Sequence, residues 1–176
     1  MDKLKVRKIV ISKQLEDSEN YEKFIKIINN KKIPVIIVEA DNKTICTQKI
    51  QIEKDLYFEI LWPKESKIIT ENSLNNNSIV CKLHYRNFSM LFTGDIEELA
   101  EKNILEEYKN NKQLLKSTVL KVAHHGSITS SSKEFIEAVQ PQISLIGVGN
   151  NNKFGHPNSN VINNLQSIRK QDLSYR

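Results

Sequence analysis

The sequence predicts an α/β fold in which mixed β-sheets are flanked by helices, and three patterns of apolar residues indicate it. Residues 5–39 have a strand, helix and strand pattern, residues 41–63 alternate apolar and polar side chains, and residues 97–168 alternate amphipathic helices with short apolar runs. A chain of 176 residues, of which 39% are hydrophobic and 27% charged, fits one domain over 1–176 with a substantial core.

The first unit is predicted to be a β-α-β motif. We expect strands over residues 5–12 and 35–39, the second one opened by Pro34. Between them, Asp17 or Ser18 is placed to cap a helix. The handedness rule for crossover connections predicts that the two strands are parallel. The apolar face of this helix, at i, i+3, i+4 and i+7, consists of Tyr21, Phe24, Ile25 and Ile28.

The middle of the chain predicts antiparallel strands. Residues 41–63 have the period of two that is typical of short strands, and the Asn-rich residues 64–77 are expected to form a loop. The clearest hairpin joins residues 78–85 to residues 88–93. His84 lies in its first strand and is expected at the surface.

The last third of the chain alternates helices and strands. Polar N-cap residues and prolines set the predicted boundaries. In order, we expect a helix over 97–109, a strand over 118–123, a helix capped by 130–132 and stopped before Pro141, a strand over 143–148, a loop over 149–157 and a helix capped by Ser159.

Composition and segment lengths restrict the location of the chain. The charged N-terminal residues 1–8 lack the apolar core of a secretory signal, and no apolar run reaches the length of a membrane span, so we expect a cytoplasmic chain without a membrane segment. Cys46 and Cys81 lie in separate strand-like segments without CxxC spacing, which predicts reduced, buried thiols rather than a disulfide.

The net charge of +5 is compatible with a nucleic-acid partner, because cationic side chains displace counterions from phosphates. However, lysines are scattered along every segment, and only four of the 26 basic residues are arginines. A solvated, lysine-rich surface explains the same charge.

Polar side chains follow two apolar runs at the points where strands are expected to end. Asp95 comes after Leu91-Phe92-Thr93-Gly94, and His124 and His125 come after a run that ends at Ala123. If these strands are neighbours, their tips bring a carboxylate and an imidazole together. Such a ligand pair suits Zn, Mn or Fe.

The same motifs resemble a known family. TGD at 93–95, LKVAHHGS at 120–127, the Ser pair that follows, an F-x-x-x-V-x-P segment from Phe135 and GHP at 155–157 are similar in order and spacing to the metallo-β-lactamase-like domain of the ComEC competence proteins. The resemblance is clear over residues 78–168 and fainter before them. It implies a two-sheet sandwich with outer helices, and hydrolysis of phosphodiesters with one or two Zn or Mn ions.

The chain departs from this family at the principal metal motif, H-x-H-x-D-H. Its four histidines, His84, His124, His125 and His156, do not have that spacing. The resemblance therefore predicts a partial metallo-β-lactamase-like sandwich that lacks the N-terminal part of the domain. Such a chain would leave a sheet face or edge uncovered, so we expect it to dimerise or aggregate.

The resemblance also implies roles for the ligand candidates. Asp95 matches the family's bridging carboxylate, and His125 matches its late metal ligand. His124 would stand behind the metal ligands or face the substrate, which makes it a candidate catalytic residue. Independently of the family, Asp95 is also suited to cap the helix that follows it, and the two histidines are also explained as exposed or hydrogen-bonded side chains.

Further positions are candidates for substrate contact. His156, held between Gly155 and Pro157, is expected to contact the substrate or transfer a proton. Gly126 and Ser127 would offer backbone N–H groups and a hydroxyl to an anion. Asn75 and Asn77 precede a strand where related enzymes have another histidine, and an amide is a poor zinc ligand.

Three hypotheses follow from these residues. The first is a metal-dependent hydrolase-like chain, ancestrally a phosphodiesterase or nuclease, with weak or no activity alone because two matched ligands are fewer than the three usual for catalytic zinc. The second is a non-catalytic module that binds nucleic acid or another phosphate ligand. The third is one half of a hydrolase whose H-x-H-x-D-H portion comes from a second chain.

Overall fold

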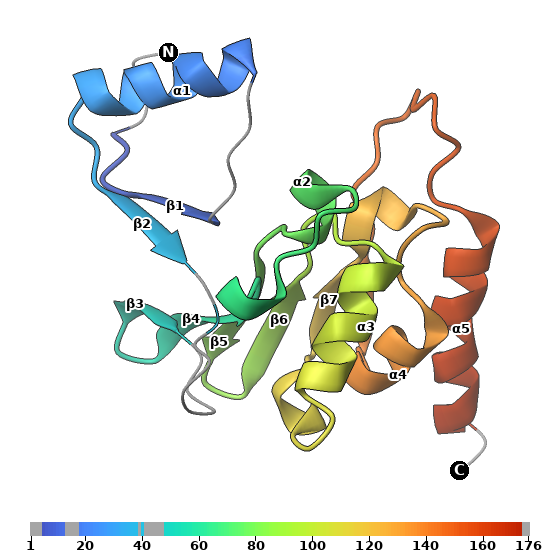
Figure 1. The fold of residues 1–176 in the computed structure, drawn as a ribbon. Helices are drawn as coiled ribbons and strands as arrows, with labels where there is room; N and C mark the ends of the chain where they lie inside the picture. The colour runs from blue at the N-terminus through green and yellow to red at the C-terminus, as the bar shows by residue number, and fades with distance from the viewer. Residues whose placement is uncertain (1–4, 13–17, 39, 41–47, 174–176) are drawn as a thin grey trace.

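The computed structural model describes residues 5–12, 18–38, 40 and 48–173, and it contains two β-sheets (Figure 1). The first sheet has two strands and the second has six. Because the six-stranded sheet combines antiparallel and parallel neighbours and has helices beside it, the prediction of an α/β fold with mixed sheets is confirmed at this level.

The predicted β-α-β unit is present at the start of the chain. Strand β1 (Ile9–Ser12) pairs in parallel with β2 (Val35–Val38), and helix α1 (Glu19–Asn30) connects them. Of the two predicted caps, Ser18 accepts a hydrogen bond from the Tyr21 backbone N–H at 3.2 Å. Asp17 lies outside the described residues.

The six-stranded sheet has the strand order β3-β4-β5-β6-β7-β8. Its first three pairings are antiparallel, and the pairings β6-β7 and β7-β8 are parallel. The predicted hairpin is β5 and β6, with Arg86 at its turn in the left-handed region. The strands are β3 (Lys49–Glu53), β4 (Leu56–Trp62), β5 (Val80–Tyr85), β6 (Phe88–Phe92), β7 (Val119–Lys121) and β8 (Ile143–Leu145).

Three helices cover one face of this sheet, which we call the closed face. Leu91 and Leu120, neighbours across β6 and β7, are 0% and 1% exposed and belong to one apolar cluster with side chains from all three helices. The helices are α3 (Glu98–Glu107), α4 (Lys133–Val139) and α5 (Ser159–Leu173). Ser132 caps α4 as predicted, whereas Asn158 rather than Ser159 receives the first N–H groups of α5.

The opposite face of the sheet, which we call the open face, is also apolar but is less covered. Phe58, Leu83 and Met90 face this side in register across three strands and are half-buried. At the edge strand β8, Ile143 and Leu145 are 49% and 48% exposed.

The Asn-rich segment 64–77 was expected to be a loop, and the structure corrects this in part. It contains a 3-10 turn, Glu65–Lys67, and a short helix α2 (Ser73–Asn76). Asn77 is 1% exposed because its amide group bonds to both backbone groups of Ile69 at 3.0 and 2.7 Å. Asn77 therefore serves as a buried connector of backbone, which composition alone does not reveal.

His84 was expected at the surface, and this prediction was wrong. Its side chain is 22% exposed, its Nε2 lies 2.9 Å from Glu59 Oε2, and its ring stacks on Tyr57. Burial lowers the pKa of His84 below its ordinary value. The hydrogen bond to Glu59 opposes this shift, and the positive charge of Lys82 adds to it. The alternation of β5 places His84 and Lys82 on the closed face, where these two polar side chains occupy positions that apolar side chains could fill.

Candidate functional site

Parallel pairing brings the predicted site residues to one edge of the sheet. Strands β6, β7 and β8 are parallel neighbours, so the loops that follow them open at the same edge. Phe92 of β6 pairs with Lys121 of β7. Asp95 and His124 each lie three residues further along, and the register therefore places the two loops face to face.

Asp95 points into the space between the loops and does not cap α3. The N-cap position of α3 is Glu97, and the cap has no side-chain hydrogen bond. Gly94 turns the chain out of β6 at a φ of 55°, where a Cβ atom would come within 2.6 Å of the Ser78 Cβ. Glycine is required there for two reasons. Residues with a Cβ atom rarely adopt this conformation, and Ser78 in the α2–β5 connection leaves no room for a Cβ atom.

His125 faces Asp95. Its Nδ1 donates a hydrogen bond to the Gly147 carbonyl at 2.6 Å, and its Nε2 lies 3.9 Å from Asp95 Oδ1. Backbone carbonyls commonly hold metal-binding imidazoles in this way, because the bond fixes both the tautomer and the ring direction. The two side chains are 50% and 41% exposed, so the pair lies at the surface.

Lys121 also faces Asp95 and was missed in the sequence. Its Nζ lies 3.8 Å from Asp95 Oδ1 and donates to the Gly94 carbonyl at 2.9 Å. The sequence contained a signal, since Lys121 interrupts the apolar run of its strand. The ammonium group makes the edge of the site less negative than Asp95 alone would.

A second pair lies beside the first. His124 Nδ1 is 3.4 Å from Glu97 Oε1, but the geometry is not that of a hydrogen bond, and this buried nitrogen has no hydrogen-bond partner. Glu97 is 12% exposed and accepts hydrogen bonds from Asn72 at 2.8 Å and from Thr129 at 3.2 Å. Glu97 was assigned only to the start of a helix, and its role beside His124 depends on how the two loops meet.

The loop that carries these histidines has a strained backbone. His124 and His125 have φ values of 45° and 55°, and Gly126 follows at 78°. Left-handed conformations of non-glycine residues cost about 1–3 kcal/mol each and occur preferentially at functional sites. The strain aims the two neighbouring imidazoles in different directions, His125 toward Asp95 and His124 toward Glu97.

The loop after β8 packs against this strained turn. A Cβ atom on Gly126 would lie 2.8 Å from the Pro157 Cβ, and the Asn158 N–H donates to the Gly126 carbonyl at 2.8 Å. His156 lies in the same loop, and its ring centroid is 6.0 Å from that of His124. The predicted site residues Asp95, His124, His125, Gly126 and His156 thus gather at one edge of the sheet.

Ser127 has internal partners. Its backbone N–H donates to the His124 carbonyl at 2.9 Å, and its hydroxyl lies 3.0 Å from the Thr129 hydroxyl. These bonds close the turn. Anion binding by Gly126 and Ser127 stays a prediction.

The residues form two pairs rather than one complete metal site. Within the described part of the chain, no group of three or more His, Cys, Asp and Glu side chains is arranged to hold a metal ion. Asp95 with His125 supplies two donors of the right type, and a catalytic zinc usually has about three protein ligands. The side chains present therefore do not make a complete metal centre.

Relatives of the chain carry names from competence and recombination. ComE operon protein 3 of Bacillus subtilis is 33% identical over 167 residues, and Competence protein ComA of Neisseria gonorrhoeae is 36% identical over 121 residues. The chain is similar to a part of each of these proteins. Recombination protein 2 of Haemophilus influenzae is 32% identical over 114 residues, and no protein-family model matches the chain.

The relationship to competence proteins covers most of this chain but a small part of each relative. The match to ComE operon protein 3 includes 94% of this chain and 20% of the relative. The matches to the Neisseria and Haemophilus proteins include 66% and 65% of this chain, and 17% and 13% of those relatives. The chain therefore spans about a fifth of these relatives' length or less. In its described part, no helix is long and apolar enough to cross a lipid bilayer.

Proposed function

We propose that this competence-related chain contributes one part of a metal-dependent phosphodiester hydrolase site. The observation that carries the proposal is the meeting of Asp95 and His125, whose Oδ1 and Nε2 atoms lie 3.9 Å apart at the tips of two parallel strands. Two ligands of one ion, each at about 2.0–2.2 Å from it, are separated by a comparable distance.

Three features support this assignment. Gly147 orients His125 through Nδ1, which leaves Nε2 for a ligand. The backbone strain at His124 and His125 directs two imidazoles to different partners. The relatives' names connect the chain with competence and recombination, for which a nucleic-acid phosphodiester is a suitable substrate class.

The missing donors define the rest of the proposal. A bound Zn or Mn ion would supply a water of lowered pKa for hydrolysis. We assign Asp95 and His125 to hold it and place His124 and His156 beside the substrate. The remaining ligands, which the family's H-x-H-x-D-H motif would provide, come from outside these 176 residues. The chain alone is therefore expected to bind metal weakly and to hydrolyse a phosphodiester such as bis-(p-nitrophenyl) phosphate little or not at all.

The proposal is tested by titrating the chain with Mn²⁺ while recording the NMR signals of its four histidines. Mn²⁺ is paramagnetic, so it should broaden the His125 signal first and the signals of His124 and His156 next. His84 is an internal reference, because it lies near the opposite end of the sheet and is bonded to Glu59. Added Zn²⁺ should compete with Mn²⁺ and restore the signals.

The matched variants are Asp95→Asn and Asp55→Asn, which make the same chemical change at the site and in the exposed β3–β4 turn. Asp95→Asn should weaken Mn²⁺ binding roughly tenfold or more because it removes an anionic ligand, and Asp55→Asn should not change it. Equal broadening of all four histidines, or an unchanged affinity in Asp95→Asn, would refute the metal role. Full hydrolytic activity of the purified chain would refute the missing ligands.

A further inference from the structure

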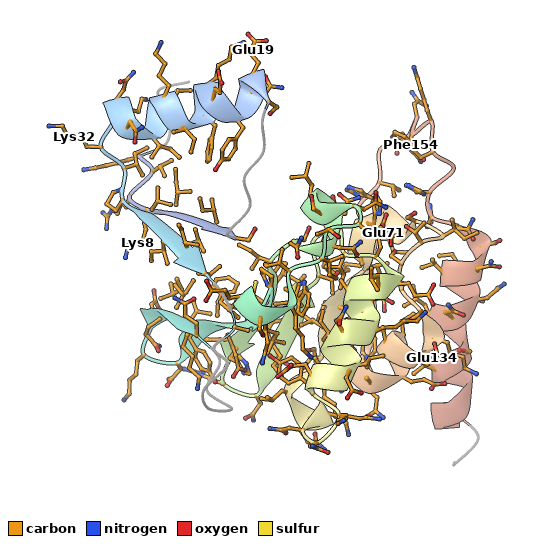
Figure 2. All side chains as sticks on the ribbon, viewed as in Figure 1. Lys8, Glu19, Lys32, Glu71, Glu134 and Phe154 are labelled. Atoms are coloured by element: carbon orange, nitrogen blue, oxygen red, sulfur yellow. The ribbon has the colours of Figure 1, made fainter. Side chains whose placement is uncertain are left out.

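An exposed aromatic side chain stands beside the candidate site and has no role in the proposed metal chemistry. Phe154 is 82% exposed, the highest value among the exposed large hydrophobic residues that the structure describes. It lies on the loop between β8 and α5, which projects beyond the body of the molecule (Figure 2). An aromatic ring held in water in this way can gain favourable free energy by burial against a partner.

Phe154 begins a row of three rings that leads into the site. Its ring centroid lies 5.8 Å from that of His156, with an angle of 17° between the planes. The His156 ring lies 6.0 Å from the ring of His124, which faces Glu97. The row therefore connects the tip of the loop with the residues that follow β6 and β7.

The loop holds this row in place through one asparagine. Asn152 accepts a hydrogen bond from the His156 backbone N–H at 2.9 Å and donates to the His156 carbonyl at 2.8 Å. Its backbone N–H also donates to the Gly149 carbonyl at 3.2 Å. Phe154 therefore lies in a turn whose backbone is held by Asn152 on both sides of it.

The surroundings of Phe154 distinguish between kinds of partner. Asn150, Asn151 and Lys153 are its exposed neighbours in the loop, and they are polar or charged rather than apolar. An aromatic ring with a neighbouring cation and amide groups is instead the arrangement that binds single-stranded nucleic acid, by stacking on a base and neutralising a phosphate.

We infer that Phe154 is a stacking platform for a base of single-stranded nucleic acid, with Lys153 contacting a phosphate. The row through His156 and His124 would then direct the adjoining phosphodiester toward Asp95 and His125. The inference rests on the proposed function only for this last step, the delivery of a phosphodiester to the site. Base stacking by Phe154 does not require a metal.

The test is fluorescence anisotropy of a labelled 12-nucleotide oligo(dT) with the full chain in EDTA. Base stacking contributes about 1–3 kcal/mol per base, so Phe154→Ala should weaken binding roughly fivefold to 150-fold. Phe154→Trp should retain it because an aromatic face remains. The matched control is Ile128→Ala, which truncates a different exposed apolar side chain. Ile128 is 62% exposed, and its truncation should not change the affinity.

Two further measurements separate stacking from charge. An oligonucleotide of the same length with abasic sites should bind the native chain and Phe154→Ala equally. Lys153→Gln should reduce the slope of log K against log salt by about 0.7, the value for one phosphate contact on a single strand.

Each outcome has a defined meaning. Equal affinity of the native chain and Phe154→Ala for oligo(dT) would overturn the inference. So would a loss that is the same for the abasic oligonucleotide, or a Phe154→Ala change confined to self-association in sedimentation. A Phe154 effect in EDTA without Mn²⁺ binding at His125 would overturn the proposed hydrolase function and leave the stacking platform in place.

Discussion

The two faces of the six-stranded sheet are built from similar residues but are covered very differently. On the closed face, Leu91 and Leu120 are 0% and 1% exposed beneath α3, α4 and α5. On the open face, Leu83 is half-buried in the centre of the sheet, and Ile143 and Leu145 are about half exposed at β8. Apolar residues at both positions of the strand alternation indicate a sheet that is suited to burial on both sides.

The difference separates what stabilises the chain from what is available for contact. Burial of apolar area is the main stabilising contribution to folding, so the closed face should provide most of the stability. The open face exposes apolar side chains, which favours association with further protein. The candidate site lies at the edge between these faces, at the ends of β6, β7 and β8.

The largest effect is expected from truncating matched leucines on the two faces. Leu91→Ala should lower the free energy of unfolding by about 2–5 kcal/mol because it leaves a cavity in a closed core. Leu83→Ala, on the neighbouring strand but on the open face, should cost less than half as much. Urea unfolding followed by circular dichroism measures both values, and equal losses would show that the two faces are covered alike.

A smaller effect is expected on self-association. The native chain should show an apparent mass that rises with concentration in sedimentation experiments, and Leu145→Lys should shift it toward the monomer because it places a charge on the open face. Leu99→Lys makes the same change on α3, where the side chain is 38% exposed, and should leave the association unchanged. A native chain that is monomeric at every concentration would contradict the expected role of the open face.

The smallest effect concerns the thiol of Cys81, which lies on the open face in register with Phe92. Burial raises the pKa of Cys81 to about 11, so only about 0.1% of it is thiolate at pH 8. In a Cys46→Ser background, iodoacetamide should modify the folded chain more than about 100-fold more slowly than the urea-unfolded chain, and the rate should rise with pH up to about 11. A rate equal to that of the unfolded chain would mean that this part of the open face is fully solvated.

The sequence indicated most elements because local patterns set them. The β-α-β unit, the β5–β6 hairpin and the helices from α3 onward occur in the order that was expected, although β1 begins at Ile9 rather than at residue 5 and Asn158 rather than Ser159 caps α5. Cys81 is a half-buried thiol and Cys46 lies outside the described residues, so the absence of a disulfide between them stays a prediction. The errors at His84 and in residues 64–77 have one cause, since polar side chains there have partners that are distant in the sequence: His84 bonds to Glu59, and the Asn76 side-chain oxygen accepts a hydrogen bond from the Glu97 backbone N–H.

Only some residues of the candidate site could be selected from the sequence. Asp95, His125 and His156 could be selected because each follows an apolar run or a glycine in a loop. Lys121 and Glu97 could not be placed beside them, because their proximity depends on the parallel register of β6 and β7 and on the turn at Gly94. The direction of each imidazole depends on the left-handed backbone at His124 and His125, which sequence patterns do not predict for residues other than glycine.

The order of residues by itself determined the strands and helices and the chemical groups at their ends, because hydrophobic periodicity and capping act over a few residues. Only the tertiary structure decided that Asp95 meets His125, that Glu97 meets His124, and that Phe154 stands in solvent beside His156. Those outcomes depend on which strands are neighbours and in what register they pair, and neither is a property of any single segment.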